Sequence, residues 1–159
     1  MLFRSTNIVF SGKANGWIYA GGSALYGGYS VVQGTASLDM AAGASAAQSI
    51  AGGGYAFGQG SESVVRDTYL DVKGSVVYAV FLGGYADQSS ASSTTGQSYL
   101  VLGSTGNVSQ SVWYGGRAYK NSTVTVNNAS ASIQGHIGAT VHKEGRASDG
   151  GSVSVTHAN

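Results

Sequence analysis

A segment of eleven residues occurs five times in this chain, and no other feature of the sequence restricts the possible folds as strongly. The five copies, which we call frames, align without gaps at Gly12–Gly22, Ala44–Gly54, Gly74–Gly84, Gly106–Gly116 and Gly135–Gly145. Their last glycines follow one another after 32, 30, 32 and 29 residues. A period of this length is typical of repeat proteins, in which each unit buries its apolar face against its neighbours. The sequence therefore predicts a stack of coils that end near Gly22, Gly54, Gly84, Gly116 and Gly145.

Equivalent positions of the frames carry similar residues. The seventh position is always β-branched and aliphatic: Ile18, Ile50, Val80, Val112 and Val141. Two residues after each frame comes an alanine: Ala24, Ala56, Ala86, Ala118 and Ala147. The third and seventh positions are four residues apart, so on a strand their side chains point to the same face. We expect the seventh positions to form one buried column, and the glycine pairs to allow close approach of the neighbouring coil.

A second strand recurs outside the frames, with apolar residues two positions apart, the period of a half-buried strand. Its predicted copies are Ser5–Phe10, Thr35–Met40, Asp67–Val72, Gln97–Leu102, Asn121–Val126 and Gly151–Thr156. With this alignment, the last two coils are about six residues shorter than the others. The longer coils leave room for a possible third strand at Ser30–Val32 and Ser63–Val65.

The composition is that of a folded β protein. Glycine accounts for 26 of 159 residues, proline is absent, 42% of residues are hydrophobic and 9% are charged. No window has the sustained spacing of apolar residues that an amphipathic helix requires. We therefore predict an all-β fold, a β-solenoid of about five coils with a repeat of about 30 residues, forming a single domain over residues 1–159. At about 4.8 Å per coil the stack is about 24 Å long.

Charge and hydropathy exclude several classes of partner. The net charge is +1, and the Lys and Arg residues are scattered, so we expect no nucleic-acid partner. No apolar run reaches 18 residues, so we expect no membrane insertion. The first residues, MLFRSTNIVFSGK, do not form a signal peptide, so we expect either a trimmed precursor or an excised piece.

The sequence contains no catalytic, metal or cofactor motif, such as HExxH, GxSxG or GxxxxGK, so we expect no catalytic, metal or cofactor site. Asp39 and Asp71 hold the same place in consecutive coils, and no basic residue is placed to separate their pKa values. We interpret them as part of a solvated strand face. The alternative, a polysaccharide lyase or hydrolase, requires Asp39, Asp71, Asp67 and Arg66 to converge in one groove.

Aromatic residues cluster around the frame ends and are the candidate site. Six of them lie at the eighth and ninth frame positions or directly after the glycines: Tyr19, Phe81, Trp113, Tyr114, Tyr55 and Tyr85. In a solenoid, equivalent rings stack in ladders, each pair contributing roughly 0.5 to 1.5 kcal/mol. Two interpretations remain open: internal stacking at the coil corners, or a ridge of exposed rings that binds sugars or the surface of a partner.

The segments SVWYGGRAYKNSTVTVNNAS and VFLGGYA resemble the Gly-Gly repeats of autotransporter-type and related bacterial surface adhesins. This resemblance extends over nearly the whole chain, from Thr6 to Thr156. It implies a β-solenoid passenger, export to the cell surface and a structural or adhesive role. Phage tail fibres and extracellular filaments use similar repeats.

The chain starts with one predicted copy of the second strand, Ser5–Phe10, and ends with another, Gly151–Thr156. The alignment therefore predicts a nearly whole number of coils. Exposed coil ends carry unpaired N–H and C=O groups that recruit further strands, so we expect head-to-tail self-association into a filament. We predict a non-enzymatic structural or adhesive module of an extracellular or bacterial cell-surface protein. The alternative is a glycan-binding or polysaccharide-degrading β-helix, including the phage tail-fibre type.

Overall fold

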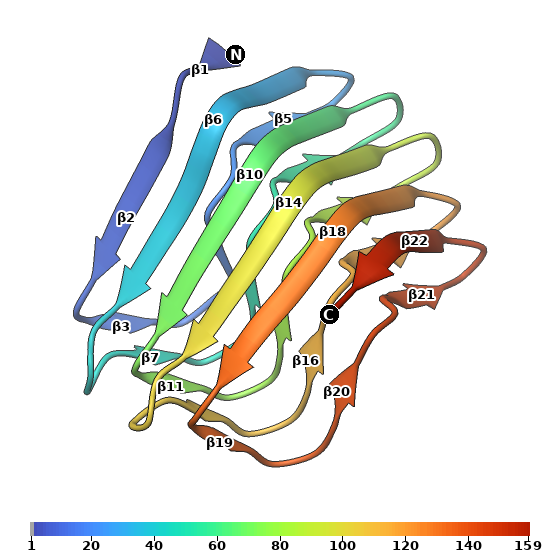
Figure 1. Cartoon of the computed structure of the whole chain (residues 1–159). Coiled ribbons are helices and arrows are strands. Elements are labelled where there is room, and N and C mark those ends of the chain that lie inside the picture. The colour runs from blue at the N-terminus through green and yellow to red at the C-terminus, as the bar shows by residue number, and fades with distance from the viewer. Residues whose placement is uncertain (1) are drawn as a thin grey trace.

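The computed structural model describes residues 2–159, and over these residues it contains strands but no helix. The chain winds into about five stacked coils, each of which adds one long strand and three short ones to the stack (Figure 1). The predicted all-β solenoid is confirmed.

The large sheet contains β1 (Leu2–Phe3), β2 (Thr6–Phe10), β6 (Tyr29–Met40), β10 (Glu62–Val72), β14 (Ser92–Leu102), β18 (Thr123–Ile133) and β22 (Ser152–Ala158), of which β6, β10, β14 and β18 are the full-length long strands. The frames carry the short strands β3 (Lys13–Ala14), β7 (Ser45–Ala46), β11 (Ser75–Val76), β15 (Asn107–Val108) and β19 (His136–Ile137). They also carry β4 (Ile18–Tyr19), β8 (Ile50–Ala51), β12 (Val80–Phe81), β16 (Val112–Trp113) and β20 (Val141–His142). After the glycines come β5 (Ser23–Leu25), β9 (Tyr55–Phe57), β13 (Tyr85–Asp87), β17 (Arg117–Tyr119) and β21 (Arg146–Ser148).

Equivalent strands of successive coils pair in parallel and form four sheets. The large sheet has the order β1-β6-β10-β14-β18-β22, with β2 also paired to β6. Three smaller sheets stack β3 to β19, β4 to β20 and β5 to β21, each with one strand from every coil. The register aligns Ile18, Ile50, Val80, Val112 and Val141 with one another. The frame alignment predicted from the sequence is therefore the structural register.

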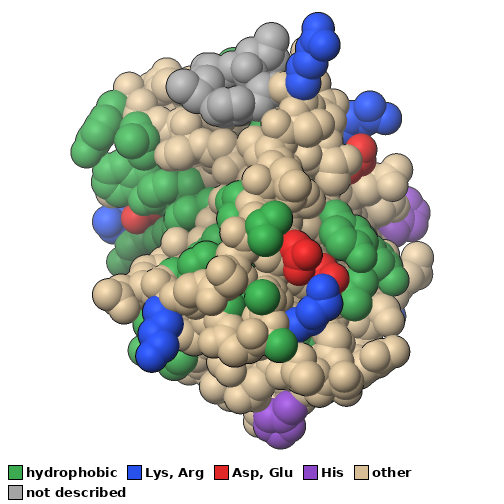
Figure 2. Space-filling model, turned by 90° about the vertical axis from the view of Figure 1, so that its left-hand side faces the viewer, with side chains coloured by type: hydrophobic (Ala, Val, Ile, Leu, Met, Phe, Trp, Pro, Cys, Tyr) green, Lys and Arg blue, Asp and Glu red, His purple; other side chains and the backbone are tan. Residues whose placement is uncertain are grey.

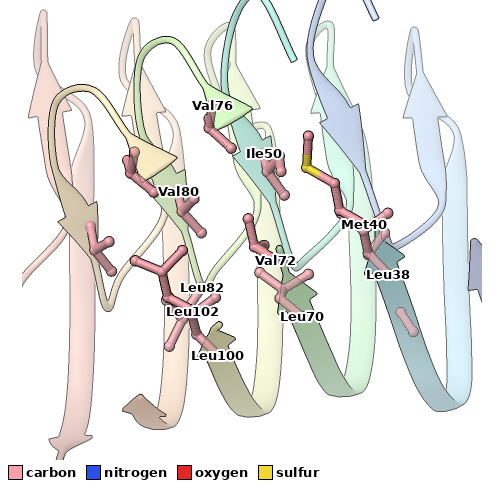
Figure 3. Packing of buried hydrophobic residues seen from close by; sticks show 14 of the residues in the cluster. Leu38, Met40, Ile50, Leu70, Val72, Val76, Val80, Leu82, Leu100 and Leu102 are labelled. Carbon is pink, nitrogen blue, oxygen red and sulfur yellow. The ribbon is translucent and has the colours of Figure 1, made fainter. Parts of the chain in front are cut away.

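Aliphatic columns fill the interior of the coils. Ile50, Val80 and Val112 are fully buried, whereas Val141, on the last coil, is 37% exposed. Leu38, Leu70 and Leu100 form a second column from the facing long strands, and Figure 3 shows the two sets pointing toward one another. The predicted aliphatic column exists, and its middle three members are completely enclosed.

The glycine pairs lie where neighbouring coils come closest. A Cβ atom on Gly84 would collide with the carbonyl oxygen of Gly54 and the hydroxyl of Ser93. A Cβ atom on Gly116 would likewise collide with the carbonyl oxygen of Gly84. Neither glycine has a positive φ, so the requirement for glycine here comes from crowding between coils and not from the turn.

The predicted alignment of the second strand is wrong in the last two coils. Leu100 and Leu102 pair with Ala131 and Ile133 of β18, and not with Val124 and Val126. Val124 and Val126 instead pair with Ser93 and Thr95, at the start of β14. The predicted second and third strands are thus two halves of one long strand, and the last two coils are not six residues shorter.

The two halves of each long strand meet at a bend, which Figure 1 shows in β6, β10, β14 and β18. In β10 the inward residues Val65 and Thr68 are three positions apart, so the alternation changes phase between them. The pairing of β10 with β6 is irregular at the same point: Val65 pairs with Val32, but Asp67 pairs with Thr35, so the register shifts by one residue. The change of phase makes one strand look like two in the sequence.

The final strand also differs from the expected end of the chain. β22 pairs with Thr123–Ala129, so it occupies the first half of a long strand, the place that β1 occupies in the first layer. The sequence alignment predicted that the chain finishes on the second half of a long strand, and this prediction is wrong.

Candidate functional site

Rings from four coils form one continuous aromatic cluster on the outside of the short sheets. Tyr19 lies 5.0 Å from Tyr55, and Tyr55 lies 5.3 Å from Tyr85, measured between ring centroids, and both pairs are stacked. Phe81 stacks with Trp113 at 6.3 Å. The structure therefore brings together five of the six aromatic residues that the sequence singled out.

Tyr114 is the exception, because its side chain points into the coil. It is 5% exposed and belongs to the same core cluster as Val80 and Leu82. Phe81 is also buried, with 2% exposed, although it lies within the cluster of rings. Neither ring therefore forms part of an exposed ridge: Phe81 stacks on Trp17 and Trp113, and Tyr114 is buried in the core of the coils.

Trp17 links the cluster and was not predicted. Its ring lies 5.7 Å from Tyr19, 5.7 Å from Phe81 and 5.3 Å from Tyr85, stacked in each case. It packs against Ala51, on the intervening second coil, and against Ala79, on the third coil, two positions with small side chains. A large residue beside small ones in the adjacent frames was the signal in the sequence that could have revealed this contact.

The same columns continue from rings into basic side chains. Arg117 follows Tyr85 in register, and its guanidinium carbon lies 5.4 Å from the Tyr85 ring centroid and 5.8 Å from that of Trp17. Arg146 occupies the next coil in the same column. His142 continues the other column and stacks on Trp113 at 3.8 Å. The sequence analysis did not predict this group, because it interpreted the Lys and Arg residues as scattered.

A cleft of about 260 Å³ lies beside Trp17, and we call it the Trp17 cleft. Its aromatic and polar lining includes Trp17, Gln48, Tyr78, Gln110, Arg117 and Arg146. Among the residues that the structure describes, no carboxylate lines it. The Nε atom of Arg117 is buried and has no hydrogen-bond partner within the part of the chain that the structure describes. The cleft thus combines aromatic surface, amides and two guanidinium groups.

The phenols in the cluster are held in the neutral form. Burial, aided by the neighbouring Tyr55 and Tyr85, raises the pKa of Tyr19 far above its usual value. Burial, followed by the effect of Tyr85 and Asp87, raises the pKa of Tyr55 to about 12. The pKa of Tyr85 also rises, through burial first and Asp87 second, although Arg117 opposes the shift. At neutral pH these groups act as hydrogen-bond donors and apolar surface.

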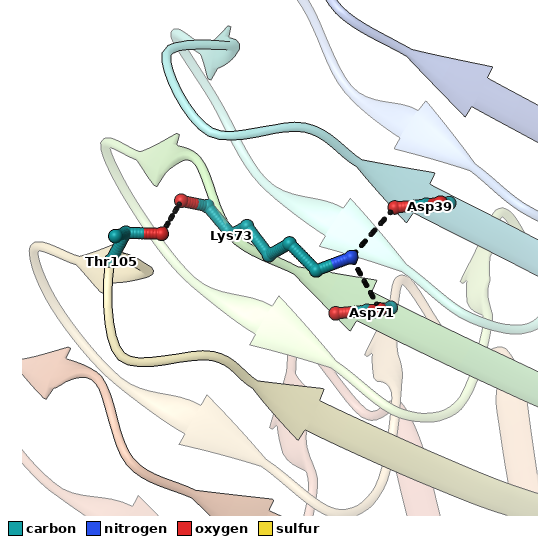
Figure 4. Close-up of polar contacts among 4 residues, drawn as sticks. All are labelled: Asp39, Asp71, Lys73 and Thr105. Carbon is teal, nitrogen blue, oxygen red and sulfur yellow. Dashed lines mark hydrogen bonds and ion pairs between the residues drawn. The ribbon is translucent and has the colours of Figure 1, made fainter.

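The carboxylates of the large sheet are paired with a lysine. Lys73 Nζ lies 3.3 Å from Asp39 Oδ1 and 2.7 Å from Asp71 Oδ2, and Figure 4 shows it reaching between the two strands. Thr105 Oγ1 donates a hydrogen bond to the carbonyl oxygen of Lys73, at 2.9 Å. Hydrogen bonds to Asp71 and then to Asp39 raise the pKa of Lys73. Lys73 lies against both carboxylates, a contact that the sequence analysis did not predict.

Asp67 does not join this group. It lies four residues before Asp71 on β10, about 13 Å along the strand, and pairs with Arg66 at 3.4 Å. The convergence of carboxylates that a polysaccharide lyase or hydrolase requires does not occur here. Figure 2 shows charged side chains dispersed over one face of the molecule among neutral polar and apolar ones.

A second, more open groove of about 370 Å³ crosses the large sheet. Tyr69 and Tyr99 stack there at 5.7 Å, and they are 40% and 38% exposed. Gln97 and Asn128 lie in the same groove. It lacks the unpaired cations of the Trp17 cleft.

Among the residues that the structure describes, no three His, Asp or Glu side chains are grouped so that they could hold a metal ion. Residues 2–159 also contain no helix that is long and apolar enough to cross a membrane.

Comparisons with protein-family models, with curated proteins and with solved structures found no match to this chain.

Proposed function

We propose that this chain is a non-catalytic structural module of an extracellular surface or filament-forming protein, and that its copies associate head to tail. The observation that carries the proposal is the open edge at each end of the stack. β3, β4 and β5 pair on one side only, with β7, β8 and β9. At the other end β19, β20 and β21 also pair on one side only. Unpaired parallel edges recruit strands of the same kind, and a contact between unlike ends does not close.

The ends offer matching apolar surfaces. Ile18 and Phe10 are partly buried members of the core at the first coil. Val141 and Ile133, each 37% exposed, occupy the equivalent positions at the last coil. If a second copy stacks on the last coil, both columns continue with aliphatic or aromatic partners, which removes apolar surface from water.

The register of the large sheet indicates where such a contact begins. β22 covers Thr123–Ala129 of β18, which leaves the edge beyond Ala129 unpaired up to Ile133. In the first layer, β2 pairs with Ala36–Met40 of β6, the segment equivalent to Ala129–Ile133. We therefore expect β2 of a second copy to add to β18, with its Phe10 over Ile133. This docking requires β1 of the second copy to yield its place to β22.

The proposed location outside the cell rests on the repeat architecture together with the likeness of the frames to Gly-Gly repeats of bacterial surface adhesins. The absence of catalysis in this proposal is supported by the carboxylates, because Lys73 bridges Asp39 and Asp71 and Asp67 lies elsewhere.

Multi-angle light scattering and negative-stain microscopy over a range of concentrations test the assembly. We expect elongated particles whose mass rises with concentration. Ile133→Asp should block growth, because it places a charge in the junction, whereas Val77→Asp, at a position 47% exposed on the middle coil, should not. Removal of residues 1–4 should favour growth, because β1 no longer competes with β22. Monomers alone at every concentration would contradict the proposal.

The Trp17 cleft favours a second candidate function, the binding of a glycan. It joins an aromatic ring, two amides and two guanidinium groups in one concave site, a combination that suits a sugar ring with its hydroxyl groups. Such binding is compatible with a structural module, because the cleft lies on the side of the stack, where Trp17 of the first coil and Arg146 of the last coil both line it.

A further inference from the structure

We infer that the Trp17 cleft binds a sugar unit that carries a carboxylate, such as a uronic acid or a sialic acid. This inference rests on the second candidate function, glycan binding, and adds the chemical class of the ligand. It is independent of head-to-tail assembly.

The first support is uncompensated positive charge. Arg117 and Arg146 are register partners on β17 and β21, so their backbones are separated by one strand spacing, about 4.8 Å. Neither guanidinium forms an ion pair with a carboxylate in the part of the chain that the structure describes. Asp87, on the same side of the stack, pairs with Lys120 at 3.7 Å. Like charges on adjacent strands repel one another, and an anion between them would relieve the repulsion.

The geometry of arginine specifies the kind of anion. A guanidinium presents parallel N–H donors that match the two oxygens of a carboxylate. The aromatic rings under Arg117 hold its plane, at 5.4 Å from Tyr85 and 5.8 Å from Trp17, while its Nε donor remains without a partner. An oriented, unpaired donor is the group that a carboxylate ligand would satisfy.

The second support is the rest of the lining, which suits a sugar ring. Trp17 offers an aromatic surface, against which the C–H groups of a sugar ring can pack. Gln48, Tyr78 and Gln110 follow one another in successive coils, linked by backbone hydrogen bonds of 3.2 and 3.0 Å. The side chains of all three are exposed at the cleft, and each amide supplies both donors and acceptors for hydroxyl groups.

The size of the cleft favours a single sugar unit over a protein partner. A volume of about 260 Å³ is at the lower limit of small-molecule sites, which range from about 300 to 1,000 Å³. A stable protein interface requires about 800 Å² of surface from each partner. An acidic peptide would engage the two arginines but would leave the aromatic and amide lining without a role.

The experiment compares matched ligands that differ only in the carboxylate. Methyl glucuronide and methyl galacturonide are tested beside methyl glucoside and methyl galactoside, together with the methyl glycoside of N-acetylneuraminic acid and a penta-glutamate peptide. Binding is followed by calorimetry and by the NMR signal of the Trp17 indole N–H. We expect at least one acidic glycoside to bind about tenfold or more tightly than the neutral glycosides, to shift the Trp17 signal and to weaken as salt is added.

Variants locate the site. Arg146→Gln, at an exposed position where the fold does not depend on the side chain, should weaken the acidic glycoside about tenfold, and Arg117→Gln should do the same. Arg66→Gln is the matched control, because that side chain is 73% exposed on the large sheet and outside the cleft. Thermal melting verifies that each variant remains folded.

Several results would overturn the inference. Equal binding of acidic and neutral glycosides would show that the cleft does not recognise the carboxylate, although glycan binding itself would stand. The absence of any shift at Trp17 with every glycoside would reject both. Penta-glutamate bound as tightly as the best acidic glycoside, or unchanged affinity in Arg146→Gln, would also contradict it.

Discussion

Replacing Val112 by aspartate tests whether the aliphatic column supports the stack. Val112 is fully buried, and its register partners are Val80 and Val141. Burial of a valine side chain contributes about 1.5 to 3 kcal/mol. A carboxylate at the same place adds a cost of several kcal/mol, because no cation lies in the aliphatic column to pair with it. We expect a loss of at least about 4 kcal/mol, from a total stability of about 5 to 15 kcal/mol.

Val141→Asp is the matched control, compared at a concentration at which the chain is monomeric. It introduces the same group in the same column, but on the last coil, where the side chain of the single chain is 37% exposed and the carboxylate can reach water. We expect a loss of about 1 kcal/mol or less.

Thermal melting followed by far-ultraviolet circular dichroism measures the difference. For a chain of this size, 1 kcal/mol shifts Tm by about 2 to 4 °C, so Val112→Asp should lower Tm by about 8 to 16 °C. Burial raises the pKa of the introduced carboxyl, so part of the loss should disappear as the pH falls and the group becomes neutral. Equal shifts for the two variants, or an unchanged Tm for Val112→Asp, would refute the proposed packing.

Three other predictions concern backbone crowding, tyrosine ionisation and surface charge. Gly84→Val should lower the urea midpoint far more than Gly12→Val, because a Cβ at Gly84 meets the adjacent coil whereas nothing lies within 4 Å at Gly12; equal midpoints would contradict this. Stability should fall between pH 10 and pH 12, because the unfolded phenol of Tyr55 loses its proton near 10 while the folded one keeps it to about 12. Tyr55→Phe should lessen that fall, as measured by denaturation at the two pH values, and an identical fall would show that Tyr55 is not buried in this way. Lys73→Met should lower Tm slightly in low salt and not in high salt, since its contacts with Asp39 and Asp71 are solvent-exposed; a loss that persists in high salt would contradict the exposed setting.

The sequence predicts the frames correctly because five gapless copies fix their alignment. Each copy has a β-branched residue at the seventh position and an alanine two residues after the last glycine, so no other alignment fits. The structural register follows it through every frame. The fold class follows from that alignment.

The long strands could not be aligned in the same way. Alternation has a period of two residues, so both Thr123–Val126 and Asn128–Ile133 fit the pattern of a half-buried strand. The more apolar segment, with Val124 and Val126, was the stronger match to Leu100 and Leu102. In the structure the place of these leucines is taken by Ala131 and Ile133, near the end of the stack. Three residues, 120–122, connect β17 to β18, and this short connection sets the register.

The candidate site was predicted in part. Stacking of equivalent positions was enough to bring Tyr19, Tyr55 and Tyr85 together. It could not place Trp17, because that ring, on the first coil, reaches past the second coil to Phe81 and Tyr85 on the third. A column analysis that includes charged residues would have found Arg117, since it follows Tyr85 directly in the alignment.

Cysteine cross-linking tests the register of the solenoid most directly, because the chain contains no cysteine of its own. Val101 and Ser132 are register partners on β14 and β18, about 4.8 Å apart, which is within disulfide range. Thr125 is the partner of Thr94, seven residues and roughly 23 Å from Val101 along the strand. Under mild oxidation, the variant with Val101→Cys and Ser132→Cys should form an intramolecular disulfide, detected by mass spectrometry, and the variant with Val101→Cys and Thr125→Cys should not. A disulfide in the second variant and none in the first would contradict the stack described here.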